Sequence, residues 1–309
     1  MNKTQVAQVT QVTGKTISAQ IVNGFVTGGI GGNPAGVVLD ADELSETEML
    51  SIAGKIGLSE TAFVSSSETE SFKLDFFTPN RRIAHCGHAT IATFSYLAEL
   101  GRVSAGATSK ETVDGPRKIS IKNGAAYMEQ LAPKYRMPGD WRKDDVTVSE
   151  VLQSLGITES DLSFSISPIL VNTGNSFIVV GVKDGATLRN LKPDFELISV
   201  VSEKLDLIGY YVFTTDNNAT DKDATTRMFA PRYAIEEESA TGMAAGPLAC
   251  VLHDHLHIGK DTFLIEQGRF MEPASPSLIT VELSIGNGEI QNLMAGGHGK
   301  VSRSLSIDY

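Results

Sequence analysis

The sequence predicts an α+β chain built from two similar domains related by a pseudo-twofold axis, with a ligand site in the cleft between them. Its 309 residues exceed what a single hydrophobic core usually serves. A strand pattern passes through the loop at residues 85–88 into a helical pattern, and residues 236–242 repeat that transition. The strands and helices around both loops follow the same order, which indicates two copies of one unit.

Composition narrows the classes of partner. The net charge is −11 and no run of Lys or Arg could follow a nucleic-acid backbone, so nucleic acid is not an expected partner. The polar N-terminus predicts neither a signal peptide nor a membrane span, and residues 1 to about 16 read as an extension. Two cysteines, Cys86 and Cys250, form no disulfide framework and suit a reducing compartment. A cytoplasmic location is therefore expected.

In the first half, the alternation of apolar residues and the turn residues between them predict the elements in order. Ser45 is expected to cap a helix that ends near residue 56, and Asn123-Gly124 is a hairpin turn. The glycine-rich segment at residues 28–36 fits a flexible turn and a substrate lid equally well. Strands are expected at residues 18–25, 37–39, 62–64, 72–77, 112–113, 119–121 and 126–130, with a helix through residues 91–100.

A composition rich in Pro and Gly at residues 131–145 predicts a linker, so the domains are placed at residues 17–130 and 131–309. The last strand of the chain could pair back with the first domain. The second half predicts helices at residues 148–155, 195–204 and from 242 to 252, and strands at 177–182, 209–215, 263–265 and 278–283.

Each loop is a candidate anion site because a helix start has unpaired N–H groups and a partial positive charge. Gly87 and Gly242 stand at the two starts, where the absence of a side chain lets a ligand approach the backbone. Cys86 and His88 flank Gly87, and both side chains can move protons. A pseudo-twofold would point both helix starts at one cleft, which is a common place for small-molecule sites.

Glu60 stands at the mouth of the strand at residues 62–64. Partial burial of a carboxylate there would favour its protonated form, which suits a group that both accepts and returns a proton near neutrality. The alternative is a solvated glutamate in a turn, since charged side chains are mostly exposed. Spacing alone leaves both interpretations open.

Six short motifs occur in an order that resembles the PhzF-like family, the phenazine biosynthesis isomerase group, which shares its fold with diaminopimelate epimerase. The resemblance covers roughly residues 18–305. It implies two domains, each a barrel-like and mostly antiparallel sheet around a central helix, and cofactor-free proton transfer on a small carboxylate-bearing substrate. The motifs are Gly32-Asn33-Pro34-Ala35, Ser59-Glu60-Thr61-Ala62-Phe63, Phe77-Thr78-Pro79, Cys86-Gly87-His88-Ala89-Thr90, Ala240-Thr241-Gly242 and Glu266-Gln267-Gly268.

The resemblance implies roles for individual residues. The acid/base glutamate of the family falls on Glu60, its loop histidine on His88 and its substrate-holding asparagine on Asn33. The second loop departs from the family pattern, because Glu238 replaces an aspartate and Met243 replaces a serine. The phenazine precursor is therefore not the expected substrate, although the reaction class is retained. Gly87, Glu238, Gly242 and Met243 join Asn33 as expected substrate-binding residues.

Two other chemistries are weighed and not favoured. A racemase of the sister families needs two facing thiols, and only Cys86 matches; the second position falls near Met243, while Cys250 lies about 12 Å further along a helix. Cys86 then reads as a small buried hydrophobe. The histidines at residues 85–88 and 253–257 lack a fixed third ligand or share no helix face, so no metal is expected.

The sequence therefore predicts a cofactor-independent isomerase, in which Glu60 moves a proton between carbons of a small anionic, cyclic or conjugated acid. In this scheme His88 positions the substrate or relays the proton, and backbone N–H groups hold its oxygens. The alternative of a different class is a metabolite-binding or regulatory protein that keeps the cleft but lacks turnover, which the altered second loop favours. A homodimer is the candidate assembly.

Overall fold

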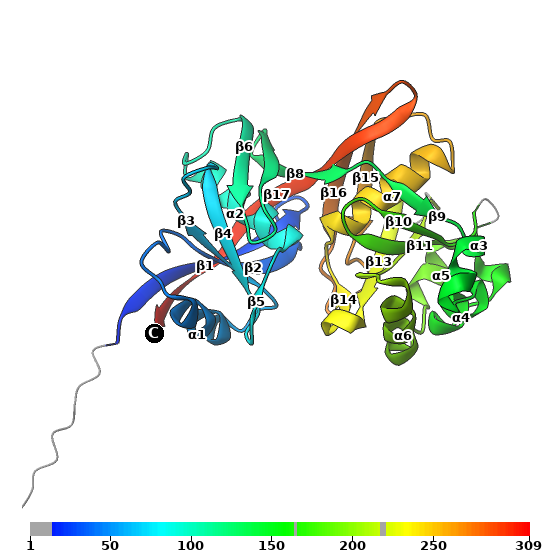
Figure 1. Cartoon of the computed structure of the whole chain (residues 1–309), viewed down its shortest axis with the longest axis horizontal. Helices are drawn as coiled ribbons and strands as arrows, with labels where there is room; N and C mark the ends of the chain where they lie inside the picture. Colours follow the sequence, from blue (N-terminus) through cyan, green and yellow to red (C-terminus); the bar gives the residue numbers. More distant parts are fainter. Residues whose placement is uncertain (1–13, 164–165, 217–220) are drawn as a thin grey trace, which may run out of the picture.

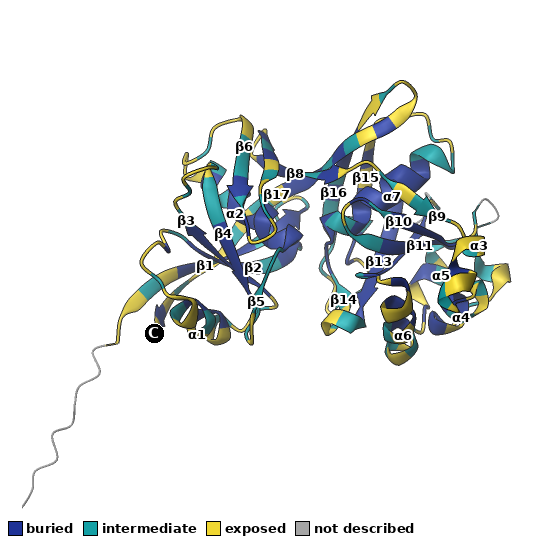
Figure 2. Ribbon diagram, in the orientation of Figure 1, coloured by how far each residue is buried: buried dark blue, intermediate teal, exposed yellow. Residues whose placement is uncertain are grey.

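The computed structural model describes residues 14–163, 166–216 and 221–309, so most of the expected N-terminal extension lies outside the described residues. The chain is α+β, as predicted, and its strands join one large mixed sheet. Figure 1 shows two bodies of secondary structure, one from each half of the chain, joined through β8 and β17. The buried residues in Figure 2 gather inside each body.

The first half of the chain supplies one body. Its helices α1 and α2 are separated along the chain by the strands β3, β4 and β5. Its elements are β1 (Thr16–Val26), β2 (Asn33–Val38), α1 (Glu46–Ile56), β3 (Thr61–Ser65), β4 (Phe72–Phe77), β5 (Arg82–Ile83), α2 (Gly87–Glu99), β6 (Gly106–Glu111), β7 (Arg117–Lys122) and β8 (Ala125–Leu131).

The second half supplies the other body and the long final strand. Its elements are β9 (Lys134–Arg136), α3 (Pro138–Trp141), α4 (Val148–Ser154), β10 (Ile169–Asn172), β11 (Ser176–Gly181), α5 (Gly185–Arg189), α6 (Phe195–Leu205), β12 (Gly209–Thr214), β13 (Ala224–Ala230), β14 (Ile235–Glu238), α7 (Gly242–Asp254), β15 (Thr262–Gln267), β16 (Ser277–Gly286) and β17 (Glu289–Asp308).

Local sequence accounts for the capped helix α1 and for the mostly buried helices α2 and α7. Ser45 and Glu48 form a capping box at the start of α1, which satisfies backbone N–H groups that the helix leaves unpaired. By contrast, α2 and α7 are apolar around most of their circumference, and most of their residues are buried. A helix that is apolar on all sides must be enclosed by other elements, so α2 packs against β1, β2, β8 and β17 while α7 packs against β11, β16 and β17.

The two halves use the same succession of strand pairings. In the first half β2 and β3 are parallel, β3 and β4 are antiparallel, and β4 runs parallel to β6. In the second half the corresponding pairs are β11 with β12, β12 with β13, and β13 with β15. In each half the central helix lies between the last two of these strands along the chain, so α2 and α7 begin at equivalent places.

The final strand links the two halves. The beginning of β17 pairs with β16 and β8, and its end pairs with β1, from Thr16 opposite Asp308 to Val26 opposite His298. The pairing of β1 in the first half is therefore complete only when the C-terminal end of β17 is in place beside it. Gly296 allows the close approach to β8, because a Cβ there would lie 2.1 Å from the carbonyl oxygen of Ala126.

Three segments differ from the sequence predictions. The expected linker at residues 131–145 contains β9 and α3, and Trp141 is fully buried with its indole N–H donating to the Arg136 carbonyl. The strand expected at residues 112–113 instead ends at Glu111, where a turn closed by Gly115 begins. Asn33 does not lie in a loop but begins β2, paired with Gly24. Local composition missed all three because tertiary packing and strand pairing decide them.

Within the described part of the chain, none of the helices combines the length and the apolar character that crossing a bilayer requires.

Candidate active site

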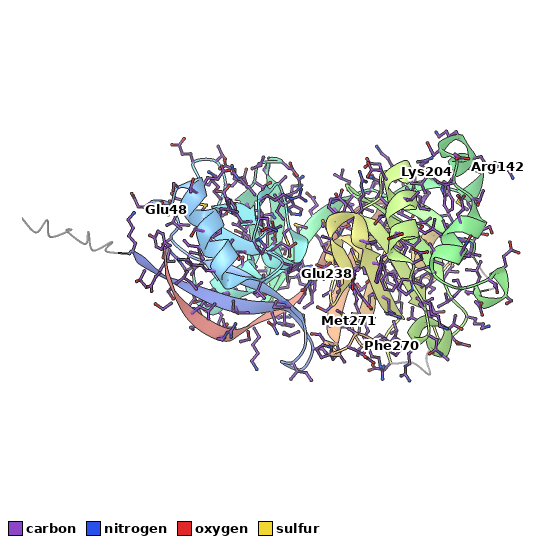
Figure 3. All side chains as sticks on the ribbon, turned by 90° about the horizontal axis from the view of Figure 1, so that it is seen from below. Glu48, Arg142, Lys204, Glu238, Phe270 and Met271 are labelled. Atoms are coloured by element: carbon purple, nitrogen blue, oxygen red, sulfur yellow. The ribbon has the colours of Figure 1, made fainter. Side chains whose placement is uncertain are left out.

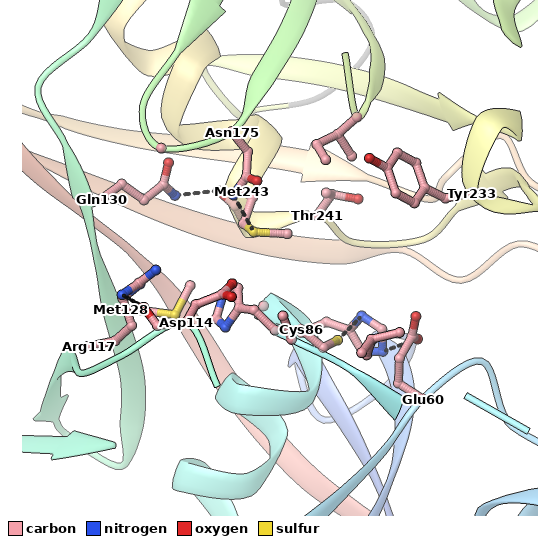
Figure 4. Close-up of a pocket in the computed structure, with 18 of the residues that line it drawn as sticks. Glu60, Cys86, Asp114, Arg117, Met128, Gln130, Asn175, Tyr233, Thr241 and Met243 are labelled. Carbon is pink, nitrogen blue, oxygen red and sulfur yellow. Dashed lines mark hydrogen bonds and ion pairs between the residues drawn. The ribbon is translucent and has the colours of Figure 1, made fainter. Parts of the chain in front are cut away.

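A cavity of about 560 Å³ lies where the two halves meet, and residues of both halves line it. From the first half come Glu60, Cys86, Gly87 and His88, and from the second come residues 238–243 apart from Ser239. Figure 4 shows Glu60 and Cys86 on one side of this cavity and Thr241 and Met243 on the other, and Figure 3 places Glu238 between the two bodies. The structure thus brings both predicted loops to one site.

Glu60 is buried, with 8% of its surface exposed, so the solvated turn weighed as an alternative is not what the structure shows. Its own carbonyl accepts from Gly36 N–H beside β3, which fixes the backbone at the cavity wall. The side-chain oxygen Oε2 lies 3.4 Å from Nε2 of His88. Neither atom has a hydrogen bond of good geometry among the described residues, although both are buried. Two such atoms facing one cavity are suited to share a ligand or a proton.

The other side of the His88 ring meets a second carboxylate. Nδ1 of His88 lies 3.2 Å from Oε1 of Glu238 and 3.5 Å from the Cys86 sulfur. Burial by itself lowers the pKa of His88, but Cys86 and Glu238 raise it by more, so this pKa stands well above its ordinary 6.5. Because burial raises the pKa of the Cys86 thiol and keeps it neutral, we assign the effect to Glu238. His88 is therefore an imidazolium that faces the Glu238 carboxylate, with Glu60 on its other side.

Glu238 is held by residues of both halves. Burial by itself raises its pKa, but hydrogen bonds from His88, Thr241 and Asn33 outweigh burial and lower it below 4.5. Thr241 Oγ1 donates to Glu238 Oε2 at 2.5 Å, and Asn33 Nδ2 donates to Oε1 at 3.0 Å. The Gln267 amide donates to the Glu238 carbonyl at 2.7 Å. The side chain of Glu238, which is longer than the aspartate of the family pattern, is therefore directed at His88 by a fixed set of hydrogen-bond donors.

Asn33 lies behind the cavity wall, where its side chain bonds the second loop instead of lining the expected substrate position. Its amide nitrogen donates to the Ala240 carbonyl as well as to Glu238, and Asn33 is not among the residues that line the cavity. It therefore joins β2 to the second loop. Direct contact between Asn33 and a substrate stays a prediction.

The two helix starts face each other. The N-cap residues Cys86 and Thr241 make no side-chain capping hydrogen bond, so within the described residues the first N–H groups of α2 and α7 have no side-chain cap. A Cβ on Gly87 would lie 3.3 Å from Cγ of Met243, which shows that the Met243 side chain occupies the space in front of α2. Its sulfur accepts from Asn175 Nδ2 at 3.2 Å, and Gln130 Nε2 donates to the Gly242 carbonyl. Asn175 and Gln130 thus hold the first residues of α7 in place.

Cys86 and Cys250 do not form a facing pair. Cys86 lines the cavity, whereas Cys250 is fully buried inside α7 and is not among the lining residues. The ligand atoms of Glu60, Cys86 and His88 lie within 4.8 Å of one another, a spacing that could hold a metal ion. The expectation of a metal-free site therefore stays a prediction, and metal analysis of the purified protein tests it.

Several lining residues were not found from the sequence. Gln130 and Asn175 come from segments that carried no chemical motif, and their roles depend on contacts across the two halves. Gln267 belongs to a motif already noted, yet only the structure shows that it bonds the second loop. Arg117 also lines the cavity from the first half, as does His85, which the sequence brought forward only as a possible metal ligand.

Comparison with known proteins agrees with this architecture. The family model described as "Phenazine biosynthesis-like protein" (PhzC-PhzF) matches residues 22–303. The chain belongs to this phenazine biosynthesis-like family. The resemblance predicted from the six motifs is thereby confirmed.

Curated members of the phenazine biosynthesis-like family show what the match implies. An uncharacterized isomerase of Clostridium acetobutylicum is 35% identical over 72% of this chain and 75% of its own. The uncharacterized isomerase YfhB of Bacillus subtilis is 32% identical over 86% of this chain and 90% of its own. A PhzF-family protein of Bacillus anthracis superposes with a TM-score of 0.85 at 26% identity, over 96% of this chain and 100% of that one. At the level of the family, these findings support an isomerase.

Proposed function

We propose that this member of the family catalyses a cofactor-independent proton shift between carbons of a small, cyclic or conjugated carboxylate, with Glu60 as the proton carrier. The observation that carries the proposal is the pair of buried atoms Glu60 Oε2 and His88 Nε2, which are 3.4 Å apart and without hydrogen bonds of good geometry among the described residues. A carboxylate so placed can take a proton from a bound carbon acid and return it elsewhere.

His88 acts on Glu60 and on the substrate together. Its positive charge, held by Glu238, lies 3.4 Å from Glu60 Oε2 and can hold that oxygen in the position from which it accepts a proton. When the proton leaves carbon, negative charge develops on the conjugated acid, and the imidazolium beside it stabilises that charge. His88 is therefore an electrostatic partner that can also relay the proton.

The substrate carboxylate is assigned to the two helix starts. The uncapped N–H groups at Gly87 and at Gly242 and Met243 face one cavity, and the partial positive charges of both helices favour an anion there. The repeated pairing order supports an internal duplication that produced the two starts. A barrel-like enclosure of α2 and α7 and a homodimer remain part of this proposal.

Transfer of carbon-bound hydrogen to solvent tests the function. The protein is incubated in deuterated water with a panel of small cyclic and conjugated acids, and mass spectrometry follows deuterium at carbon. We expect exchange for at least one acid, and loss of that exchange in Glu60→Gln. Binding of an acid without exchange would favour the second candidate, a metabolite-binding protein, which the Met243 side chain in front of Gly87 supports.

A further inference from the structure

One wall of the cavity carries basic side chains that the proposed proton shift does not use. His85, Arg117 and Arg81 line the cavity, and Lys110 lies behind His85 with its side chain completely buried. Figure 4 shows Arg117 and Glu60 at opposite ends of the same side of the cavity. The basic wall, defined as His85, Lys110 and Arg117, is therefore separate from the carboxylates at Glu60.

Hydrogen bonds tie the basic wall together. Nζ of Lys110 lies 3.0 Å from Nδ1 of His85 and donates to Thr90 Oγ1 at 2.5 Å. It also lies 4.8 Å from the centre of the Phe76 ring, whose face attracts a cation. Thr90 Oγ1 donates in turn to the Cys86 carbonyl, so this set of contacts fixes the segment that precedes α2.

No carboxylate among the described residues pairs with the basic wall. Arg117 donates from Nη1 only to the carbonyls of Asp114 and Pro116, and the partners of Lys110 are His85, Thr90 and Phe76. By contrast, the buried Arg227 is paired with Glu237 at 2.7 Å. Within the described residues, Lys110 and Arg117 thus stand at the cavity wall without an acidic partner, in a chain whose net charge is −11.

Electrostatics agree with the contacts. Burial, together with the charges of Lys110 and Arg117, holds the pKa of His85 well below its ordinary value. Burial likewise holds the pKa of Lys110 well below its ordinary value. The exposed carboxylate of Asp114 lines the cavity nearby and opposes this field, but makes no ion pair with Arg117 within 4 Å. An anion at His85 would favour the protonated forms of His85 and Lys110 and would place a negative charge near Arg117.

We propose that the basic wall binds a second acidic group of the substrate, so that the substrate class of this site is a small molecule with two anionic groups. This inference rests on the proposed function, which assigns the first carboxylate to the helix starts. His85 and Arg117 contact the second group from the cavity side, while Lys110 positions His85 from behind. A carboxylate and a phosphate share the chemistry that such a wall recognises.

The test compares pairs of acids that differ only in the second anionic group. Isothermal titration measures Kd for succinate, glutarate and adipate, and for butyrate, valerate and hexanoate of the same carbon number. We expect at least one dicarboxylate to bind tenfold or more tightly than its monocarboxylate partner. 3-Phosphonopropionate, tested beside succinate, which has the same two methylene groups between its acidic groups, shows whether the wall prefers a phosphate-like group.

Variants locate the preference. Arg117→Gln and His85→Gln are expected to reduce the dicarboxylate preference to threefold or less while leaving monocarboxylate binding near its original strength. Arg303→Gln, which removes the same charge from an exposed position of β17, serves as the control and should keep the full preference. His85 and Arg117 are both partly accessible, so we expect the two variants to fold. Thermal unfolding of each variant checks that the fold is kept.

Three outcomes would overturn the inference. Equal binding of dicarboxylates and monocarboxylates at every length removes the second anion site, and so does binding of neither series. A dicarboxylate preference that survives in both cavity variants places the second site elsewhere. These acids report binding without reaction, so a failure to exchange hydrogen with solvent would reject the proposed proton shift and leave this result standing.

Discussion

Oε1 of Glu238 lies 3.2 Å from Nδ1 of His88, although the two residues belong to opposite halves of the chain. The contact spans the cavity between β14 and the start of α2, so it joins the two bodies and sets the charge of the catalytic candidate at the same time. Asn33, Thr241 and Gln267 hold the Glu238 end of this contact. Stability and proposed chemistry are therefore coupled through one ion pair.

Replacement of Glu60 by Gln should remove hydrogen exchange while the fold is kept. The amide has nearly the same shape, so it can occupy the same buried position beside His88 but cannot carry a proton from carbon. General acid/base groups commonly contribute about 10²–10⁴-fold in rate, and a loss of that size is expected. Deuterium incorporation measures the rate and thermal unfolding measures the fold.

Glu99→Gln, at an exposed position near the end of α2, is the matched control and should exchange at the parent rate. Exchange by Glu60→Gln at the parent rate would remove Glu60 from the mechanism.

Replacement of Cys86 by Ser should be far less damaging. The thiol is buried, burial raises its pKa, and the facing second loop presents Met243 in place of another thiol. We expect Cys86→Ser to retain at least a tenth of the exchange rate. A loss as complete as that of Glu60→Gln would instead restore a mechanism in which the thiolate moves the proton.

The His88–Glu238 ion pair should make stability depend on pH in a defined direction. The raised pKa of His88 means that its contribution is fully present below pH 6.5 and is lost as the pH rises through its folded-state pKa. The lowered pKa of Glu238 means that its contribution is present above pH 4.5 and is lost as the pH falls through its folded-state pKa.

The difference in unfolding free energy between the parent and Glu238→Gln should therefore be largest near pH 5–6 and should shrink on both sides. Urea unfolding at a series of pH values measures it. A difference that stays constant from pH 4 to pH 10 would show that the pair does not titrate as described.

Replacement of Gly87 by Leu should block the anion position between the helix starts. A Cβ there already lies 3.3 Å from Met243, so a larger side chain must fill the space in front of α2. Sulfate, monitored by its effect on thermal unfolding, is expected to bind the parent and to bind this variant at least tenfold more weakly.

Gly139→Leu is the control, because a Cβ at Gly139 has no heavy atom within 4 Å. A crystal structure in sulfate that places the ion away from both helix starts would contradict the shared position.

The sequence by itself determined the local features of this protein. Apolar periodicity and caps gave the α+β class, α1 behind Ser45 and the two helix starts, because these depend on residues close together in the chain. Glu60 could be singled out for the same reason, from its place before β3. The family followed from six motifs in order, and the match to residues 22–303 confirmed it.

The tertiary structure decided which distant residues meet. The sequence raises the return of the last strand to the first half, but not its register against β1. No local pattern shows that Glu238 reaches His88 or that Asn33 bonds the second loop. The burial of Lys110 behind His85 is also decided by strand pairing, since a lysine on a short strand reads as exposed in the sequence. Electrostatic partners depend on distance in space, and that distance is fixed only when the strands of both halves have paired.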